Sequence, residues 1–228
     1  MKFSRTFLNR LHDQPEASDT VVVIDVLRSF TTAAVVLARG AAAIYPADGL
    51  AAAADLLGRL ENPVSVGAVG GGAPAPGFDH GNSPSELMHA DLAGRPVVIS
   101  TAAGVLGLHR FRRARRLYAA SLVCARATAD AIRAAGAEHV CFVITGEWVD
   151  RDGDEDLACA DYIEALLQGR DPPPDSFGER VRNSDFGRRF AAGTWPYLPR
   201  GDLDIAARAD LFGFAMPVGH EEGRLMIC

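Results

Sequence analysis

A short apolar segment, followed by charged and hydroxyl side chains, limits the folds open to this chain more than any other feature of its sequence. The segment Val21-Val22-Val23-Ile24 contains only β-branched residues, which is typical of a buried strand. Asp25 and Arg28 follow it, and the apolar residues 33–38 then favour a helix. Ligands of open α/β sheets bind outside the carboxyl ends of the strands, and helix N-termini favour anions. The segment therefore predicts an acid and a guanidinium at a ligand-binding edge, unless Asp25 only caps the helix and Arg28 is solvated.

The rest of the chain alternates between strand and helix signals. This alternation predicts an α/β fold in which helices cover both faces of a sheet. Asp48 is expected to cap a helix that runs to Arg59, and Ser83 is expected to cap another. We expect a single domain over residues 1–228, with a less regular part from about residue 170. We predict strands at 21–25, 42–45, 64–66, 95–99, 117–119, 139–144, 214–217 and 224–227, and further helices at 31–39, 103–109, 124–135, 154–168, 176–182, 185–191 and 203–210.

Composition narrows the class of protein. The formal net charge of −6 argues against nucleic-acid binding, and the one basic run, at 110–116, fits a solvated connection between elements. No apolar run reaches the length of a membrane span, and residues 1–14 lack the apolar core of a signal peptide. We therefore expect a cytoplasmic protein without a nucleic-acid or membrane partner, and we allow for a homodimer. The cysteines show no CxxC spacing, which indicates reduced thiols: Cys124, Cys141, Cys159 and Cys228.

Polar groups follow several of the predicted strands. Asp25 ends the first, Ser100-Thr101 a later one, and Thr145-Gly146-Glu147 another. If these strands are parallel, the three groups converge at one edge of the sheet, where such folds bind ligands.

A glycine-rich loop precedes the helix expected to begin at Ser83. It ends in Gly77-Phe78-Asp79-His80-Gly81-Asn82-Ser83-Pro84, which places Asp79 and Asn82 beside a free helix N-terminus. Backbone N–H groups of such loops can bind phosphate. The spacings of the Walker A motif and of the dinucleotide fingerprint are absent, so by itself the loop is a weak signal.

An acidic stretch surrounds the start of the helix expected at 154–168. Mg²⁺ takes oxygen ligands, often one or two carboxylates together with substrate phosphate. The alternative is a solvated loop followed by acids that complement the helix dipole. Cys159 lies one helical turn after Glu155, where it either faces the same site or is a buried structural thiol. The acids are Asp150, Asp152, Asp154, Glu155 and Asp156, and they lack the EF-hand spacing.

Three motifs, in this order, resemble the 2-phosphosulfolactate phosphatase (ComB) family. They are Ile24-Asp25-Val26-Leu27-Arg28-Ser29-Phe30-Thr31-Thr32, the loop at 77–84, and Glu155-Asp156-Leu157-Ala158-Cys159-Ala160. Asp202-Leu203-Asp204-Ile205-Ala206 and Pro217-Val218 are similar to its C-terminal region, so the likeness spans about residues 20–218. The resemblance implies a three-layer α/β/α fold with a mixed, mainly parallel sheet.

The resemblance also implies a Mg²⁺-dependent acid phosphatase, a phosphoric monoester hydrolase that releases phosphate from 2-phosphosulfolactate. Together with the strand ends it gives a set of expected site residues. The expected catalytic residues are Asp25, Arg28 and Cys159, and the expected metal ligands are Asp25, Glu155 and Asp156. The expected substrate-binding residues are Arg28, Ser29, Thr31, Asp79, Asn82, Ser83, Thr101, Gly104 and Gly146.

Individual roles within this set are hypotheses. Asp25 and one of Glu155 or Asp156 would hold Mg²⁺ against the phosphoryl group, where the metal neutralises developing charge and can activate a water. Arg28 would bind a phosphate, sulfonate or carboxylate in bidentate fashion. Asn82 and the N–H groups near residues 83–86 would position another anionic oxygen. Asp25 as a covalent nucleophile is the alternative to an activated water.

The chain departs from the family pattern in two places. Gly67 is followed by Ala68 where the family usually has Gly-Glu, and Thr101-Ala102-Ala103-Gly104-Val105 replaces the usual Thr-Thr-Asn-Gly-Thr. A carboxylate, an amide and two hydroxyls are therefore missing, and losing one preorganised donor can lower a rate on the order of a hundredfold. The alternative function is thus a catalytically altered or inactive relative that binds a phosphorylated or sulfonated metabolite.

Overall fold

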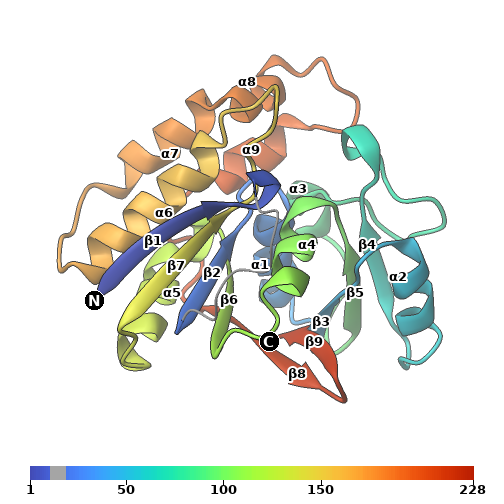
Figure 1. Ribbon diagram of the computed structural model, residues 1–228. Helices are drawn as coiled ribbons and strands as arrows, with labels where there is room; N and C mark the ends of the chain where they lie inside the picture. Colours follow the sequence, from blue (N-terminus) through green and yellow to red (C-terminus); the bar gives the residue numbers. More distant parts are fainter. Residues whose placement is uncertain (11–18) are drawn as a thin grey trace.

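The computed structural model describes residues 1–10 and 19–228, and its centre is one mixed β-sheet (Figure 1). Residues 11–14 of the segment expected to lack a signal peptide lie outside the described residues. The strands are β1 (Lys2–Phe7), β2 (Thr20–Ile24), β3 (Ala43–Pro46), β4 (Val64–Gly67), β5 (Pro96–Ser100), β6 (Arg116–Ala120), β7 (His139–Ile144), β8 (Met216–Glu221) and β9 (Arg224–Ile227). Their order in the sheet is β1-β7-β2-β6-β8-β9-β3-β5-β4.

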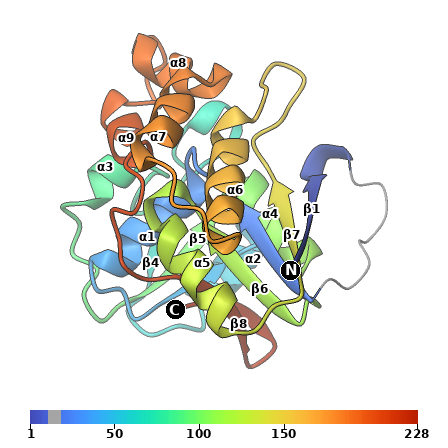
Figure 2. The ribbon, with the colours of Figure 1, turned by 90° about the vertical axis from the view of Figure 1, so that its left-hand side faces the viewer.

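Helices cover both faces of this sheet (Figures 1 and 2). This arrangement confirms the predicted three-layer α/β/α fold with a mixed, mainly parallel sheet. No helix in residues 1–10 and 19–228 has both the length and the apolar character needed to cross a membrane. The α-helices are α1 (Ser29–Ala38), α2 (Leu50–Leu57), α3 (Pro84–Leu87), α4 (Ala103–Arg110), α5 (Ala125–Ala134), α6 (Asp154–Leu167), α7 (Pro174–Asn183), α8 (Asp185–Ala192) and α9 (Arg200–Ala206).

The C-terminal hairpin joins two parallel halves of the sheet. Strands β1, β7, β2 and β6 are parallel on one side, and β3, β5 and β4 are parallel on the other. Between them, β8 runs antiparallel to β6, while β9 runs antiparallel to both β8 and β3. The hairpin, red at the bottom of Figure 1, is what makes the sheet mixed.

The β-branched segment of β2 is fully buried at the middle of the first half. Val22 and Ile24 belong to the core cluster formed with α5 and α6. Val21 and Val23 belong to a second cluster that includes residues of α1 and α4. Gly107 of α4 lies so close that a Cβ atom there would be 2.6 Å from Val23. Burial on both sides explains why the sequence is apolar without alternation.

Some local predictions need correction. Gly49, with φ of 89°, precedes α2, and no side chain caps that helix, so the predicted cap at Asp48 is wrong. The predicted cap at Ser83 is confirmed, because its hydroxyl accepts the N–H of Glu86. The helix expected at 203–210 instead spans Arg200–Ala206. The first strand, Lys2–Phe7, has no counterpart among the predicted elements.

Candidate active site

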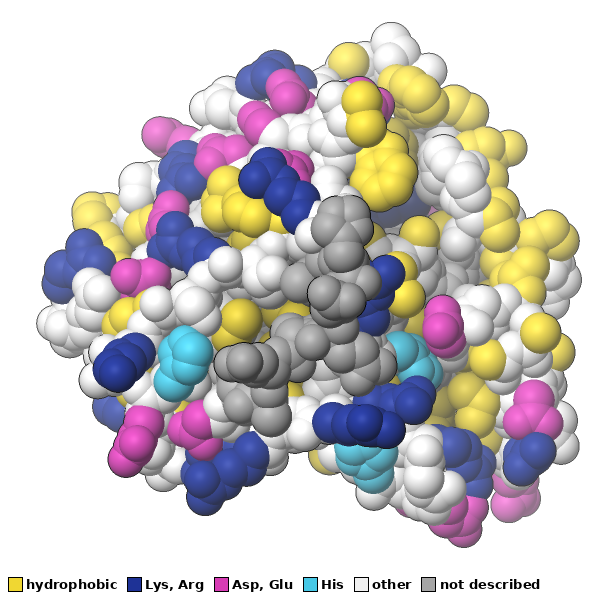
Figure 3. Space-filling model, in the orientation of Figure 1, with side chains coloured by type: hydrophobic (Ala, Val, Ile, Leu, Met, Phe, Trp, Pro, Cys, Tyr) yellow, Lys and Arg dark blue, Asp and Glu magenta, His cyan; other side chains and the backbone are white. Residues whose placement is uncertain are grey.

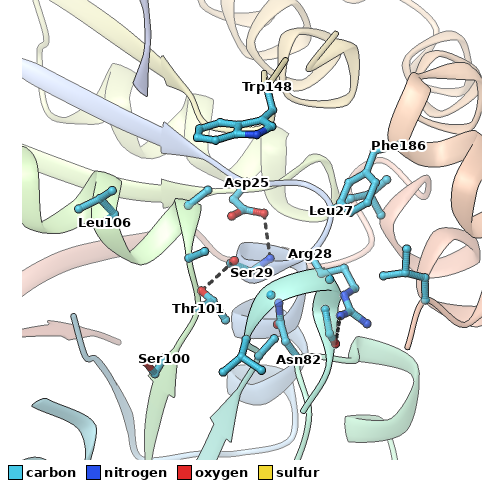
Figure 4. Close-up of a pocket in the computed structure, with 18 of the residues that line it drawn as sticks. Asp25, Leu27, Arg28, Ser29, Asn82, Ser100, Thr101, Leu106, Trp148 and Phe186 are labelled. Atoms are coloured by element: carbon cyan, nitrogen blue, oxygen red, sulfur yellow. Dashed lines mark hydrogen bonds between the residues drawn. The ribbon is translucent and has the colours of Figure 1, made fainter. Parts of the chain in front are cut away.

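A cavity of about 630 Å³ lies at the carboxyl edge of the sheet. Asp25 follows β2, Thr101 follows β5, and residues 68–72 follow β4, so three strand ends contribute to its lining. Figure 4 shows Asp25 near the centre, beneath Trp148, with Ser29 close by. Asp25 and Thr101 therefore meet at one edge, as parallel strands predict.

The ends of two helices orient the Asp25 carboxylate. Its Oδ1 atom accepts the N–H of Ser29, at the start of α1, and its Oδ2 atom accepts the N–H of Gly104, near the start of α4; both distances are 2.9 Å. A Cβ atom at Gly104 would lie 2.8 Å from Oδ2, so this approach requires glycine. Each carboxylate oxygen keeps a further lone pair for a ligand.

Asp156 connects α6 to the backbone that follows β2 and β7. Its Oδ1 atom accepts the N–H of Val26 at 2.8 Å. Its Oδ2 atom accepts the N–H groups of Thr145 and Gly146, at 3.0 and 2.7 Å, and the Thr145 hydroxyl at 3.2 Å. With three donors on Oδ2 and one on Oδ1, Asp156 fixes the backbone that follows β2 and β7 and has less capacity left for a metal than Asp25.

Glu155 is the acid whose oxygens are uncommitted. It is fully buried, and neither carboxylate oxygen has a hydrogen-bond partner among the described residues. A Cβ atom at Gly146 would lie 2.5 Å from its Oε1 atom, so glycine leaves the space that this side chain fills. Burial raises the pKa of Glu155 to about 7. Because an unpartnered buried charge is costly, a proton or a cation should accompany this carboxylate.

The charges of Asp25 and Glu155 both act on Asp156. Burial raises the pKa of Asp25, and hydrogen bonds from Ser29 oppose that rise. Burial, together with the charges of Glu155 and Asp25, raises the pKa of Asp156 well above its ordinary value. Asp25 and Glu155 therefore both lie within electrostatic reach of Asp156. Of the three acids, only Asp25 lines the cavity.

Among the predicted metal ligands, Asp25 and Glu155 keep the most free acceptor capacity on their carboxylate oxygens. Each Asp25 oxygen accepts one backbone N–H, and neither Glu155 oxygen has a partner in residues 1–10 and 19–228. No cluster of three or more His, Cys, Asp or Glu side chains in the described ranges is placed to hold a metal ion. Mg²⁺ usually needs only one or two carboxylates, with substrate phosphate and waters as its other ligands. The Oδ2 atom of Asp156, with three donors, has no lone pair left for the predicted role as a third ligand, whereas Oδ1, with one donor, retains one.

Arg28 is held in a buried ion pair with Asp202. One Nη atom donates to Asp202 at 2.8 Å and to the Tyr197 carbonyl at 2.9 Å, and the other donates to the Gly72 carbonyl at 3.2 Å. The two charged side chains are 4% and 0% exposed. Arg28 reaches the cavity wall, but its charge is already neutralised. This geometry favours a structural role over the predicted bidentate clamp.

Within the motif at 77–84, which ends the glycine-rich loop, Asn82 is the residue that lines the cavity. Asn82 is buried, and its Oδ1 atom has no hydrogen-bond partner among the described residues. Asp79 instead accepts the N–H and the hydroxyl of Ser65, at 2.8 and 2.7 Å, which fastens the loop to β4. Ser83 donates to Asp202 at 2.8 Å and caps α3. Asp79 and Ser83 thus support the loop away from the cavity lining.

Two further predicted residues lie in the interior. The Thr31 hydroxyl donates to the Val26 carbonyl at 2.7 Å and lies 2.6 Å from the Ser121 hydroxyl. Cys159 is fully buried in the core cluster between α5, α6 and the sheet. Burial raises the pKa of its thiol well above the ordinary value, which disfavours the thiolate. Neither side chain lines the cavity, so we leave both out of the proposed site.

Comparison with known proteins identifies the family. The sequence profile of the 2-phosphosulpholactate phosphatase family matches residues 6–186 of this chain. The chain belongs to this family. Its members are phosphatases, which agrees with the predicted class of phosphoric monoester hydrolases.

Individual members of the 2-phosphosulpholactate phosphatase family are similar over much of the chain. A probable 2-phosphosulfolactate phosphatase from Carboxydothermus hydrogenoformans is 32% identical over 91% of this chain and 89% of its own length. One from Thermus thermophilus is 40% identical over 65% of this chain and 62% of its own length. One from Thermoplasma volcanium is 29% identical over 83% of this chain and 84% of its own length.

The departures from the 2-phosphosulpholactate phosphatase pattern have unequal consequences. Ala68, Ala102 and Ala103 all line the cavity, so the missing carboxylate, hydroxyl and amide would have faced it. Val105 is 1% exposed and packs in the core, so its departure does not change the cavity wall. The cavity of this family member is therefore less polar than the family pattern predicts.

Two residues that are important to the site were not predicted from the sequence. Asp202 lies in the C-terminal motif, but nothing in the motif indicates that it pairs with Arg28, which is 174 residues away. Arg151 lines the cavity, although it belongs to the acidic stretch that reads as a solvated loop or metal site. A lone cation within an acidic run is the only sequence signal that could have drawn attention to Arg151.

Proposed function

We propose that this chain is a Mg²⁺-dependent phosphatase of a small anionic phosphoester such as 2-phosphosulfolactate. The observation that carries the proposal is the Asp25 carboxylate, oriented by the N-terminal ends of α1 and α4 at the cavity floor. The free oxygens of Glu155 nearby and membership of a phosphatase family support it. A cytoplasmic location is part of the proposal, and the absence of CxxC spacing among the cysteines supports it.

The residues around the cavity have separable tasks in this proposal. The starts of α1 and α4 favour the anionic phosphoryl group electrostatically. Asn82 offers an uncommitted amide to one of its oxygens. Asp25, fixed from both sides, either orients an attacking water or attacks the phosphorus itself. Mg²⁺ held by Asp25 and Glu155 would neutralise charge that develops on the phosphoryl oxygens.

Removal of the metal is expected to abolish phosphate release. Dialysis against EDTA should lower the rate at least about a hundredfold, because Asp25 and Glu155 alone would then repel the phosphoryl group. Added Mg²⁺ should restore the rate. The measurement is inorganic phosphate released from 2-phosphosulfolactate and from simpler phosphoesters. Full activity of metal-free protein would contradict the role of Mg²⁺.

A second candidate function, binding without turnover, is favoured by the three alanines in the cavity wall. If it holds, ligands should raise the unfolding temperature while no phosphate appears. Replacing Ala68→Glu together with Ala103→Asn would return a carboxylate and an amide to the wall, and we expect phosphate release to increase about tenfold or more. Val105→Thr, which alters only the core, is the matched control. A wild-type rate that the double variant does not raise would speak against this candidate.

A further inference from the structure

Three arginines line the catalytic cavity, and two of them already form hydrogen bonds and ion pairs with other groups of the protein. Arg28 is neutralised by Asp202. Arg189 donates to the carbonyl and the carboxylate of Asp150, at 2.8 and 2.9 Å. Neither guanidinium is therefore fully available for an anionic ligand.

Arg151 is the uncommitted cation. Among the described residues its guanidinium has no hydrogen-bond or ion-pair partner, and its Cζ atom lies 4.6 Å from the centre of the Phe186 ring. Two backbone hydrogen bonds with Trp148, of 3.1 and 3.2 Å, fix the turn that carries it. Stacking on an aromatic ring occupies the face of a guanidinium and leaves the N–H groups at its edge free for a carboxylate, sulfonate or phosphate.

The position of Arg151 suits the end of a ligand that does not react. Figure 4 places Phe186 to one side of Asp25, with Trp148 above Asp25. Burial raises the pKa of both Asp25 and Glu155, and the charge of Arg151 opposes part of that rise, so the guanidinium lies within electrostatic reach of both acids. A small ester with its phosphoryl group at Asp25 would extend its other end toward this wall.

We propose that Arg151 binds the oxyanion of the substrate that is not transferred, a carboxylate or a sulfonate. Arg151 thereby selects phosphoesters that carry a second negative charge. This inference rests on the proposed phosphatase function, because it assumes that the phosphoryl group lies at Asp25. It also transfers to Arg151 the anion-binding task that the sequence assigns to Arg28.

The test compares three esters of similar size in wild type, Arg151→Gln and Arg151→Lys. They are phosphoglycolate, with a carboxylate; 2-phosphooxyethanesulfonate, with a sulfonate; and 2-hydroxyethyl phosphate, without a second anion. Arg151→Gln should lower kcat/KM for at least one charged ester about 10- to 100-fold, mainly through KM, because a charge-assisted hydrogen bond is lost. The neutral ester should change less than about twofold. Arg151→Lys should recover part of the loss.

Arg182→Gln is the matched control, since Arg182 is exposed and pairs with Asp204 outside the cavity. It should change none of the three rates. An equal loss on all three esters would assign Arg151 to the phosphoryl group or to folding, and would overturn the inference. Unchanged kcat/KM for both charged esters would overturn it as well.

Calorimetric binding of sulfolactate, which has a carboxylate and a sulfonate but no phosphate, separates this inference from the proposed function. Binding should weaken about 10- to 100-fold in Arg151→Gln. That result in a protein that hydrolyses no ester would support the anion site while refuting the phosphatase proposal. Equal binding to both proteins, or to neither, would overturn the inference.

Discussion

Replacing Asp25 by asparagine is expected to lower kcat/KM for phosphoester hydrolysis about a thousandfold or more. Both Asp25 oxygens accept backbone N–H groups, from Ser29 and Gly104. The asparagine amide must turn an NH₂ group toward one of these donors, so the side chain loses its orientation along with its charge. It also loses its capacity as a metal ligand or nucleophile.

The experiment measures phosphate release and thermal unfolding of the same preparations. Asp130→Asn is the control, because Asp130 lies on the exposed surface of α5, where it pairs with Arg133. It should retain wild-type activity. Asp25→Asn should unfold within a few degrees of wild type, since removing a buried charge offsets part of the lost hydrogen bonding. A variant that keeps a tenth of the activity would exclude Asp25 from the reaction.

Loss of Asp202 is expected to have the largest effect on stability. Asp202→Ala should reduce the free energy of unfolding by about 3–5 kcal/mol, because it leaves the Arg28 guanidinium buried without its counter-charge. It also removes the acceptor for Ser83 and for the N–H and hydroxyl of Ser85, at 2.6 to 3.0 Å. The glycine-rich loop would then lose its attachment to α9.

Urea unfolding provides the measurement, and α9 offers a close control. Asp204 lies two residues further on, where it forms an exposed pair with Arg182. Asp204→Ala should cost less than about 1 kcal/mol, as is usual for surface pairs. Arg28→Met combined with Asp202→Leu should be more stable than Asp202→Ala alone, since an apolar pair leaves no buried charge. Equal stability of the Asp202 and Asp204 variants would contradict the buried ion pair.

The sequence predicts the fold wherever a segment carries its own signal. Strand β2, strand β7 and helix α6 lie close to their predicted bounds, because a continuous apolar run or a helix-start pattern marks each one. The edge strand β1 was missed because Lys2–Phe7 is polar and only partly buried. The position of the C-terminal hairpin depends on pairing with β6 and β3, about 100 and 180 residues earlier, which no local pattern reveals.

The candidate site, like the fold, could be predicted from the sequence only in part. Motif order brings Asp25, Asn82 and Thr101 to one cavity, where the structure places them. The roles of the other site residues depend on how deeply each side chain is buried and on which groups it contacts, and the sequence shows neither. They give Arg28 a counter-charge, place three donors on one oxygen of Asp156, and leave the Arg151 guanidinium without a hydrogen-bond or ion-pair partner in the described part of the chain.

The position of the hairpin between the two halves of the sheet determines when the sheet can be completed during synthesis. Strands β8 and β9 leave the ribosome after all the others, yet they fill the middle of the sheet. Until residues 216–227 have been synthesised, β6 and β3 each present an open edge, and such edges favour pairing with other chains. The nascent chain therefore has two edges that are open to aggregation until β8 and β9 pair with them.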